Sequence, residues 1–557
     1  MTPNTTPLGQ AIPDKHHAVS VQLPRWNDVC DFGLGKPRVH DVLKNGYPRT
    51  FLHRDVRALV DSCSRGFVSS SQGLALFPDY SAAADCKSFI TSERIQKADA
   101  VDSESVSLFA VYFYKKEKEP SSTEGLLPAT LATLYAVVHP VRAESSKMTF
   151  WRLTGRGISS RRAEQYLDQE CQFVQIDTPP PKLQSLPEHP VYETLRERIA
   201  DLLERAPINP QRVARVSSRD VYLHPSGMSA IYHAHHALLR WRYSDIIMLG
   251  FPYELSIKMI ETLGPPYRFF SFGTDNEIDQ LEQLLRGKAE KGEKIQAVWC
   301  ECPNNPMLRT VDINRVRKLA DRYDFLLVID DTIGSFANVD VQDVADIIVT
   351  SLSKNFSGSA DVLAGSVVIN PHFRHSSELK PAFDASYTNS LYVGDAEQLE
   401  YNSRRYLANL SRQNDTASFL ADFFHPYVAD PTSTLTTLFY PKVCWSRHNY
   451  RARLRPVTED FVPGYGAVLA LSFETVAAAS AFFDSLDLYK GPSFGATITI
   501  AVPYVQLVLQ KDKEWASTNG LDETLVRISV GLEDKEALLR CVKVALQAAD
   551  ATKEGIY

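Results

Sequence analysis

A single lysine, Lys354, stands in a setting that suggests chemistry. It lies in "TSLSKNFSGSADVLAGS" (350–366), just after the apolar run Ala345–Val349, with hydroxyls nearby at Ser351 and Ser353. A charged amine at the end of a buried strand is costly unless it is paired or neutralised. The position therefore predicts a lysine that is occupied by a ligand.

Three other stretches place polar or aromatic residues after apolar runs. "HPSGMS" puts Ser226, Gly227 and Met228 at the start of a predicted helix. Free backbone N–H groups there can bind an anion, although a plain serine N-cap explains the same residues. Tyr253 in "GFPYELS" can stack on a planar ligand or simply pack. Asn305 in "ECPNNP" lies in a tight turn, which accounts for it without any ligand.

Two adjacent aspartates, Asp330 and Asp331, end the apolar run "FLLVIDD". A carboxylate at the end of a buried strand needs a cationic partner or several donors. Neighbouring side chains of a strand point to opposite faces, so one of the two can face a ligand.

Together these groups suit pyridoxal 5′-phosphate. The lysine would form a Schiff base with the aldehyde, and an aspartate would keep the pyridine nitrogen protonated so that the ring accepts electrons. The phosphate would be held by Ser226, Gly227, Met228, Ser351 and Ser353.

The elements that must position these residues follow an α/β pattern between about residues 220 and 370. Short apolar runs alternate with amphipathic stretches, which predicts a buried, mainly parallel sheet with helices on both faces. The predicted strands are "DIIMLGF", "YRFFSF", "IQAVWCE", "FLLVID", "ADIIVTS" and "AGSVVI", and the predicted helices span 228–241, 255–263, 277–291 and 313–323.

The chain has 557 residues and is too long for one hydrophobic core. We expect an N-terminal extension (1–145), an active-site arm and Pro-rich connector (146–192), a large α/β domain that binds the cofactor (193–394), a long connecting helix (395–429) and a smaller C-terminal α+β domain (430–557). The charged "KKEKEPSSTEG" (115–125) predicts an exposed loop, and "DTPPPKLQSLPEHP" (177–190) is the connector.

Composition narrows the functional class. The formal net charge of -7 argues against a protein that binds nucleic acid through a basic surface, and no apolar run approaches the length of a membrane span. The start lacks the apolar core of a secretory signal, so a cytoplasmic enzyme is expected. The eight cysteines form no C-x-x-C pair, and Cys300 and Cys302 read as buried packing residues. His233 and His236 in "HAHH" lack an accompanying carboxylate, so no metal site is predicted.

The ordered motifs resemble the Cys/Met-metabolism family of pyridoxal-phosphate enzymes, of fold type I. "SxSK", "ExPxNP", "VIDDT", "SGM" and the closing "LVRISVGLED" carry this resemblance. "HAVSVQLPRW", "GYPRTFLH", "GISSRRAE", "NSRRY" and "KGPSFG" are similar to the fungal cystathionine γ-synthase branch. The resemblance covers nearly the whole chain, including an N-terminal extension that bacterial relatives lack. It implies a seven-stranded-type, mainly parallel sheet and a smaller C-terminal domain.

The resemblance also implies roles at matching positions. Lys354 would be the Schiff-base lysine and proton shuttle, Asp330 the partner of the pyridine nitrogen, and Tyr253 the stacking ring that helps proton transfer. Asn305 would lie near the ring hydroxyl, and Arg527 would bind the substrate α-carboxylate through two hydrogen bonds. The remaining implied site residues are Gly227, Met228, Ser351 and Ser353 at the phosphate and Ser493 near the active site.

The sequence departs from the family pattern at three places. The family's Y-x-R, whose arginine reaches the phosphate in a neighbouring subunit, has Phe150 and Arg152 of "FWRLTGRG" in its place. Ala364 stands where glycine is frequent, and Asp331 where asparagine is common. The shared active site of the family implies a homodimer or homotetramer.

The expected reaction is γ-replacement on an O-acyl-L-homoserine with L-cysteine, which gives L-cystathionine. An alternative within the same chemistry is another nucleophile, sulfide or a carbon acid, in specialised metabolism. An alternative of another class is an inactive scaffold with the same fold, against which the presence of Lys354, Asp330 and Arg527 speaks. The acyl group and the nucleophile stay open at this point.

Overall fold

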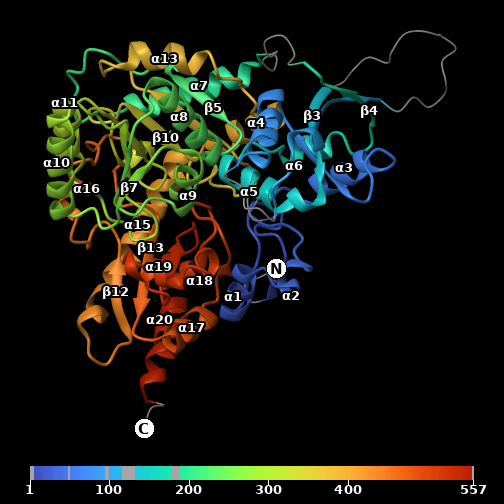
Figure 1. Cartoon of the computed structure of the whole chain (residues 1–557). Coiled ribbons are helices and arrows are strands. Elements are labelled where there is room, and N and C mark those ends of the chain that lie inside the picture. Colours follow the sequence, from blue (N-terminus) through green and yellow to red (C-terminus); the bar gives the residue numbers. More distant parts are fainter. Residues whose placement is uncertain (1–4, 48–50, 94–98, 116–131, 179–187, 555–557) are drawn as a thin grey trace, which may run out of the picture.

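Three sheets organise the described part of the chain. The computed structural model describes residues 5–47, 51–93, 99–115, 132–178 and 188–554. Along the chain these residues form a four-stranded, a seven-stranded and a five-stranded sheet. Figure 1 shows the seven-stranded sheet and its helices as the largest part, with the N-terminal sheet beside it and the C-terminal part below.

The central sheet confirms the predicted α/β architecture. Its order is β5-β11-β10-β9-β8-β6-β7, and only β11 runs against the others. All six predicted strands are present, and β5 is an additional strand that the sequence pattern did not reveal. The strands are β5 Val221–His224, β6 Ile246–Leu249, β7 Tyr267–Phe270, β8 Ala297–Glu301, β9 Leu326–Asp330, β10 Ile347–Thr350 and β11 Gly365–Ile369.

The helices of this part begin at residues that cap them. Ser226, Thr274 and Asp312 each accept a backbone N–H with the side chain, which satisfies one of the orphan donors of the first turn. The four predicted helices agree with the structure to within two residues: α8 Gly227–Trp241, α9 Glu254–Leu263, α10 Asp275–Glu290 and α11 Ile313–Tyr323. The others are α7 Pro190–Glu204, α12 Ser335–Asn338 and α13 Ser376–Asp384.

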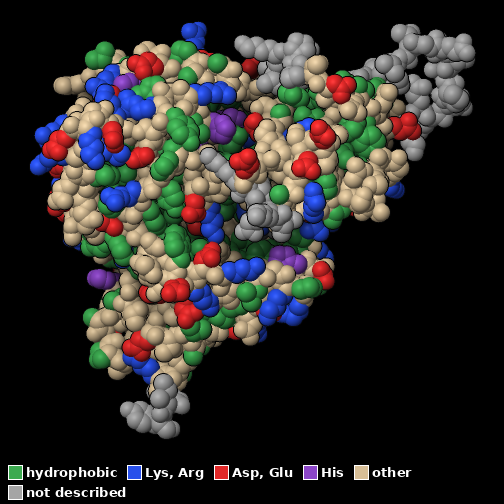
Figure 2. Space-filling model, in the orientation of Figure 1, with side chains coloured by type: hydrophobic (Ala, Val, Ile, Leu, Met, Phe, Trp, Pro, Cys, Tyr) green, Lys and Arg blue, Asp and Glu red, His purple; other side chains and the backbone are tan. Residues whose placement is uncertain are grey.

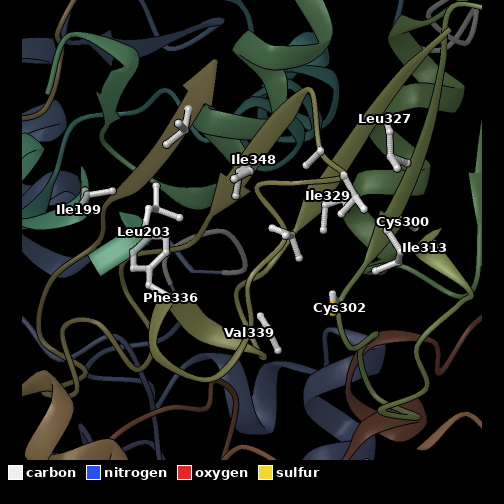
Figure 3. Close-up of a cluster of buried hydrophobic side chains, with 14 of the residues drawn as sticks. Ile199, Leu203, Cys300, Cys302, Ile313, Leu327, Ile329, Phe336, Val339 and Ile348 are labelled. Atoms are coloured by element: carbon white, nitrogen blue, oxygen red, sulfur yellow. The ribbon is translucent and has the colours of Figure 1, made fainter. Parts of the chain in front are cut away.

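The core of the large domain lies between this sheet and its helices. Cys300 and Cys302 belong to a cluster of buried apolar side chains that includes Leu327, Ile329 and Val339 (Figure 3). Burial raises the pKa of both thiols, so they stay protonated and pack as small apolar side chains. The prediction that these cysteines serve packing is thus confirmed.

The N-terminal sheet differs from the predicted boundaries. It is antiparallel, in the order β1-β3-β2-β4, and β4 pairs along β2. Residues 146–192 therefore do not form a separate arm and connector, because the last strand of the first sheet lies inside that range. The elements are α3 Arg54–Ser64, β1 Gln72–Phe77, α4 Tyr80–Ile90, β2 Ser107–Tyr114, β3 Ala132–Pro140, α5 Glu144–Thr154, α6 Ser160–Glu164 and β4 Glu170–Gln175. Most of the predicted loop at 115–125 and of the connector at 177–190 lies outside the described residues.

The C-terminal part is a five-stranded sheet in the order β12-β13-β16-β15-β14, as expected for a small α+β domain. The long helix predicted over 395–429 is two helices, α14 Val393–Ser403 and α15 Tyr406–Phe424, because the chain breaks at Arg404 and Arg405. The remaining elements are β12 Leu435–Phe439, α16 Arg447–Arg451, β13 Val468–Phe473, α17 Val476–Ser485, β14 Tyr489–Lys490, β15 Ile500–Pro503, α18 Tyr504–Val508, α19 Lys513–Thr518, β16 Val526–Ser529 and α20 Lys535–Glu554.

The N-terminal segment, residues 5–47, contacts both the large domain and the small domain. The segment carries α1 Trp26–Leu34 and α2 Pro37–His40. Val19 N–H donates to the Ala360 carbonyl at 2.8 Å, and Leu23 N–H donates to the Lys490 carbonyl at 2.7 Å. The segment therefore ties the loop after Lys354 to the small domain.

The surface of the described residues mixes both signs of charge on the face drawn in Figure 2, where acidic and basic side chains are interspersed. Within the described residues, no helix has both the length and the apolar character that a membrane crossing requires.

We predict that Gly491→Ala detaches the N-terminal segment. A Cβ built at Gly491 would lie 2.1 Å from the Val21 carbonyl oxygen, so the backbone of one segment must shift. We expect a cost of about 1–3 kcal/mol and faster proteolysis before residue 47, measured by thermal unfolding and limited proteolysis.

Gly287→Ala provides the matched control. A Cβ at this position in α10 meets nothing within 4 Å, so the substitution should be neutral or stabilise by about 0.5–1 kcal/mol. Equal protease resistance of Gly491→Ala and wild type would contradict the docking of the segment at this glycine.

Candidate active site

A cavity of about 570 Å³ lies where the large domain, the small domain and the N-terminal segment meet. Its floor is formed by residues at the carboxyl ends of β8, β9 and β10, the edge where ligands bind in open α/β sheets. The predicted site residues that line it are Arg152, Gly227, Met228, Tyr253, Asn305, Asp330, Ser351, Lys354, Ser493 and Arg527.

Lys354 lines this cavity and is 6% exposed. Its Nζ donates hydrogen bonds to Ser493 Oγ and to Tyr47 Oη, each at 3.2 Å. The amine also lies over the rings of Tyr47 and Phe494, 4.7 and 4.6 Å from the centroids. Two hydroxyls and two aromatic faces thus hold the amine in the cavity.

Asp330 and Asp331 are separated as the strand geometry predicts. Asp330 is the one partly exposed residue of β9, because it lines the cavity, and its Oδ1 accepts the Thr332 N–H at 2.9 Å. Asp331 is fully buried and does not line the cavity, and Thr350 Oγ1 donates to it at 2.6 Å. Burial raises the pKa of Asp330 to about 6 and that of Asp331 to about 7.

A third carboxylate, Glu301, lies beneath Tyr253 and Asn305. Its two oxygens accept the backbone N–H groups of these residues at 2.7 and 2.9 Å. Burial, and then the charge of Asp330, raises its pKa well above the usual value. Glu301 therefore fixes the positions of the predicted stacking ring and the predicted amide. Sequence reasoning missed this role, although Glu301 ends a buried strand as Asp330 does.

The predicted phosphate residues divide into two groups. Gly227, Met228 and Ser351 line the cavity, and a Cβ added at Gly227 would lie 2.7 Å from Ser351 Cβ. Ser226 does not line it: its Oγ caps α8 by accepting Ser229 N–H and donates to the Gly155 carbonyl at 2.9 Å.

Ser353 also points away from the cavity. Its hydroxyl donates to the Ala364 carbonyl at 3.2 Å and accepts the Ala364 N–H at 3.0 Å. Its place in the structure is to fix the loop after the lysine, and Ser226 has the plain capping role that the sequence left open. The prediction that both serines hold phosphate is not confirmed.

Arg527, on β16, reaches the cavity from the small domain. It is 5% exposed, and its two terminal nitrogens donate to Asn305 Oδ1 at 2.9 Å and to the Ser493 carbonyl at 3.0 Å. The guanidinium carbon lies 5.1 Å from the Phe494 ring centroid and 5.3 Å from that of Tyr504. Burial lowers its pKa below the usual value, which leaves it charged at neutral pH.

Arg152, on α5, lines the cavity of its own chain. From the sequence we expected this arginine to reach a neighbouring subunit, and in the single chain it needs no neighbour to lie at the site.

Tyr47 was missed, although "GYPR" contains a Y-x-R triplet, Tyr47-Pro48-Arg49, that could have revealed it. Arg49 lies outside the described residues.

The groups that line the cavity fit pyridoxal phosphate. The chemistry of that group needs a buried amine, an acid for the ring nitrogen and a cradle for an anion. Lys354, Asp330 and the Cβ-free turn at Gly227, which opens α8, supply these three within one cavity. The positive end of a helix favours an anion at that turn.

Comparisons with known proteins agree with this geometry. The model of the Cys/Met metabolism PLP-dependent enzymes matches residues 211–547, and that of the fungal trans-sulfuration enzyme N-terminal domain matches 55–159. The alanine racemase ungC of Aspergillus violaceofuscus is 39% identical, with 98% of this chain and 97% of that protein covered. The cystathionine gamma-synthase-like enzyme iboG2 of Amanita muscaria is 34% identical (99% and 98% covered), and the cystathionine gamma-synthase of Neurospora crassa is 31% identical (98% and 98%).

Solved structures support the fold. The cystathionine gamma synthase of Xanthomonas oryzae pv. oryzae, in complex with aminoacrylate and cysteine, superimposes with a TM-score of 0.53 at 22% identity, covering 66% of this chain and 87% of that one. The cavity with its lysine, aspartate and arginine, the matched family models and the full-length relatives lead to one conclusion. The chain belongs to the Cys/Met-metabolism family of pyridoxal-phosphate-dependent enzymes, on its fungal cystathionine γ-synthase-like branch.

Proposed function

We propose that the protein catalyses γ-replacement on an O-acyl-L-homoserine, with L-cysteine as the nucleophile and L-cystathionine as the product. The observation that carries this proposal is the convergence of Lys354, Asp330 and Arg527 on one cavity. Relatives that bear the name cystathionine gamma-synthase, at 26–31% identity over at least 97% of this chain, support the same reaction.

The side chains divide the work by their chemistry. Bound pyridoxal phosphate supplies an electron sink for the negative charge that develops at Cα and Cβ of the substrate. Arg527 holds the α-carboxylate with two parallel N–H donors, and Lys354 removes the Cα proton and then a Cβ proton. The γ-acyloxy group leaves with the electrons of its bond to Cγ, the cysteine sulfur adds at Cγ with loss of its own proton, and protons return to Cβ and Cα. Tyr47 and Ser493 hold the lysine amine where it can make both transfers.

The cavity has room for a second substrate. Its lining also includes residues of α1 and α2, of α9 and of the stretch after α18, and the exposed residues among them form its mouth. Lys258 from α9 and Asp512 from the small domain form a 3.1 Å ion pair across this mouth. A cavity of about 570 Å³ favours the joining of two amino acids over the handling of one small one.

Two alternatives share the same first step, removal of the Cα proton. One is γ-replacement with sulfide or a carbon acid in place of cysteine. The other is racemisation, which the 39% identical relative named an alanine racemase favours. Racemisation needs no leaving group at Cγ, so the two classes separate by product.

Assembly is part of the proposal as well. The family resemblance supports a homodimer or homotetramer, and Arg152 lines a cavity in its own chain, so each chain would bring this arginine to its own site.

The first test is a product assay. Incubation with O-acetyl-, O-succinyl- or O-phospho-L-homoserine and an equal mixture of cysteine, sulfide and a carbon acid should give cystathionine as the main product by mass spectrometry. A parallel incubation of L-alanine in deuterated water should give little labelled D-alanine. Racemised alanine without any γ-product would overturn the proposal in favour of the racemase alternative.

The second test concerns Lys354. Borohydride reduction of the holoenzyme should fix the cofactor mass on the peptide that contains Lys354. Lys354→Ala should lose turnover by at least about 10³-fold, because the buried amine proposed to move the proton is removed. Lys258→Ala, at the mouth of the same cavity, is the control and should keep the label on Lys354. A label found on another lysine rules out this assignment.

The third test uses the raised pKa of Asp330, which burial moves to about 6. Below that pH the carboxyl is neutral and no longer pairs with a protonated ring nitrogen, so affinity for the cofactor should fall by about tenfold per pH unit below pH 6. Fluorescence titration of the cofactor-free protein between pH 5 and 8 measures this fall.

Two variants separate the neighbouring aspartates. Asp330→Asn should bind the cofactor more weakly than wild type at pH 7.5, and its affinity should no longer show the additional decrease below pH 6. Asp331→Asn should still show this decrease. The reverse pattern would show that Asp331 is the residue that faces the ring.

A further inference from the structure

A buried carboxylate that the proposed mechanism does not use, Glu254, lines the cavity beside the substrate arginine. It is the first residue of α9, directly after Tyr253, and is 4% exposed. Its Oε2 accepts the hydroxyl of Tyr504 at 2.7 Å. A carboxylate that is removed from water in this way needs a compensating positive charge.

Arg527 supplies that charge through a short relay. Tyr504 Oη accepts from Asn305 Nδ2 at 3.4 Å, Asn305 Oδ1 accepts from Arg527 at 2.9 Å, and the guanidinium lies over the Tyr504 ring. Burial, and then the charge of Glu254, keeps the pKa of Tyr504 well above its usual value, so the hydroxyl remains a donor to Glu254. The negative charge of Glu254 also acts on Arg527 and offsets part of the burial effect on its pKa.

The arginine is therefore not an unopposed cation. A carboxylate that approaches Arg527 is attracted by the guanidinium and repelled by Glu254, and in a site shielded from water both forces are strong. An amino acid carries a positive nitrogen beside its carboxylate and meets an oppositely charged group on each side. A carboxylic acid without nitrogen gains nothing from Glu254 to offset its repulsion.

We propose that Glu254 is a specificity-determining residue that makes the Arg527 site reject carboxylates lacking an α-amino group. The inference rests on the proposed role of Arg527 as the carboxylate-binding residue of the active site. It extends that role by naming the substrate feature, a cationic nitrogen next to the carboxylate, that the carboxylate–arginine pair selects.

The test compares two ligands of equal length, butyrate and L-2-aminobutyrate. Calorimetric titration of the cofactor-free protein and of the holoenzyme gives the affinity for butyrate, and absorbance titration of the holoenzyme gives that for 2-aminobutyrate. Glu254→Gln keeps the size and the hydrogen-bond acceptor but removes the charge. We expect Glu254→Gln to bind butyrate about tenfold more tightly than wild type does, both without and with the cofactor. The affinity for 2-aminobutyrate should change by less than about threefold.

Two control variants isolate the buried charge of Glu254 as the cause. Glu261→Gln removes an exposed charge of the same helix at the mouth of the cavity, where water screens it, and should leave butyrate affinity unchanged. Tyr504→Phe keeps both charges and removes only the hydroxyl, so it should not tighten butyrate binding. Unchanged or weaker butyrate binding in Glu254→Gln, or equal tightening in Tyr504→Phe, would overturn the proposal.

A separate binding experiment tests whether Arg527 is the residue that binds the carboxylate. Arg527→Lys should weaken butyrate and 2-aminobutyrate alike, by about tenfold or more, because the two parallel donors are lost. If both ligands bind Arg527→Lys as they bind wild type, the arginine is not the carboxylate site and the inference about Glu254 fails with it. The butyrate measurements on the cofactor-free protein need no turnover, so they hold whichever product the first assay finds.

Discussion

Charge compensation away from water governs the structure around the cavity. Lys354, Asp330, Glu301 and Arg527 are ionisable groups placed where solvent reaches poorly, and each requires specific partners to be tolerated there. Glu301 meets this requirement with two backbone N–H groups, and Arg527 meets it with an amide and a carbonyl oxygen. The partners come from several elements, so the charges hold those elements in register.

The partners of the lysine show why three parts of the chain must meet. Lys354 follows a strand of the central sheet, Ser493 belongs to the small domain, and Tyr47 ends the N-terminal segment. The segment is held by backbone hydrogen bonds to the loop after the lysine and to the strand before Ser493. The segment thus supplies one of the hydrogen-bond partners of the lysine, which gives the residues up to Tyr47 a structural reason to be present.

In the loop that carries Lys354, some polar side chains face the cavity and others hold the loop in place through hydrogen bonds. Ser351 faces the cavity, whereas Ser353, two residues later, is occupied by both backbone groups of Ala364. A hydroxyl that bonds to both groups of a distant residue fixes the loop as firmly as an apolar contact would, because both bonds are buried. The same division separates Gly227, at the cavity wall, from Ser226, which caps α8 and bonds to the end of α5.

The sequence by itself determined the class of the protein and the centre of its site. Apolar runs of strand length with alternating helices were sufficient for the central sheet, because burial on both faces leaves a continuous apolar signal, and a lysine and an aspartate at strand ends stand out against it. The four-stranded N-terminal sheet was not foreseen, since β4 pairs with β2 across more than 50 residues and half-exposed strands such as β4 show only weak alternation. The resemblance already implied Asp330 rather than Asp331 at the cofactor, and only Asp330 lines the cavity. The tertiary structure alone decided that Ser226 and Ser353 bond elsewhere, and that Tyr47, Glu254 and Tyr504 join the site. These outcomes depend on the direction of single side chains and on contacts between segments up to about 300 residues apart, and a local sequence pattern carries no information about either.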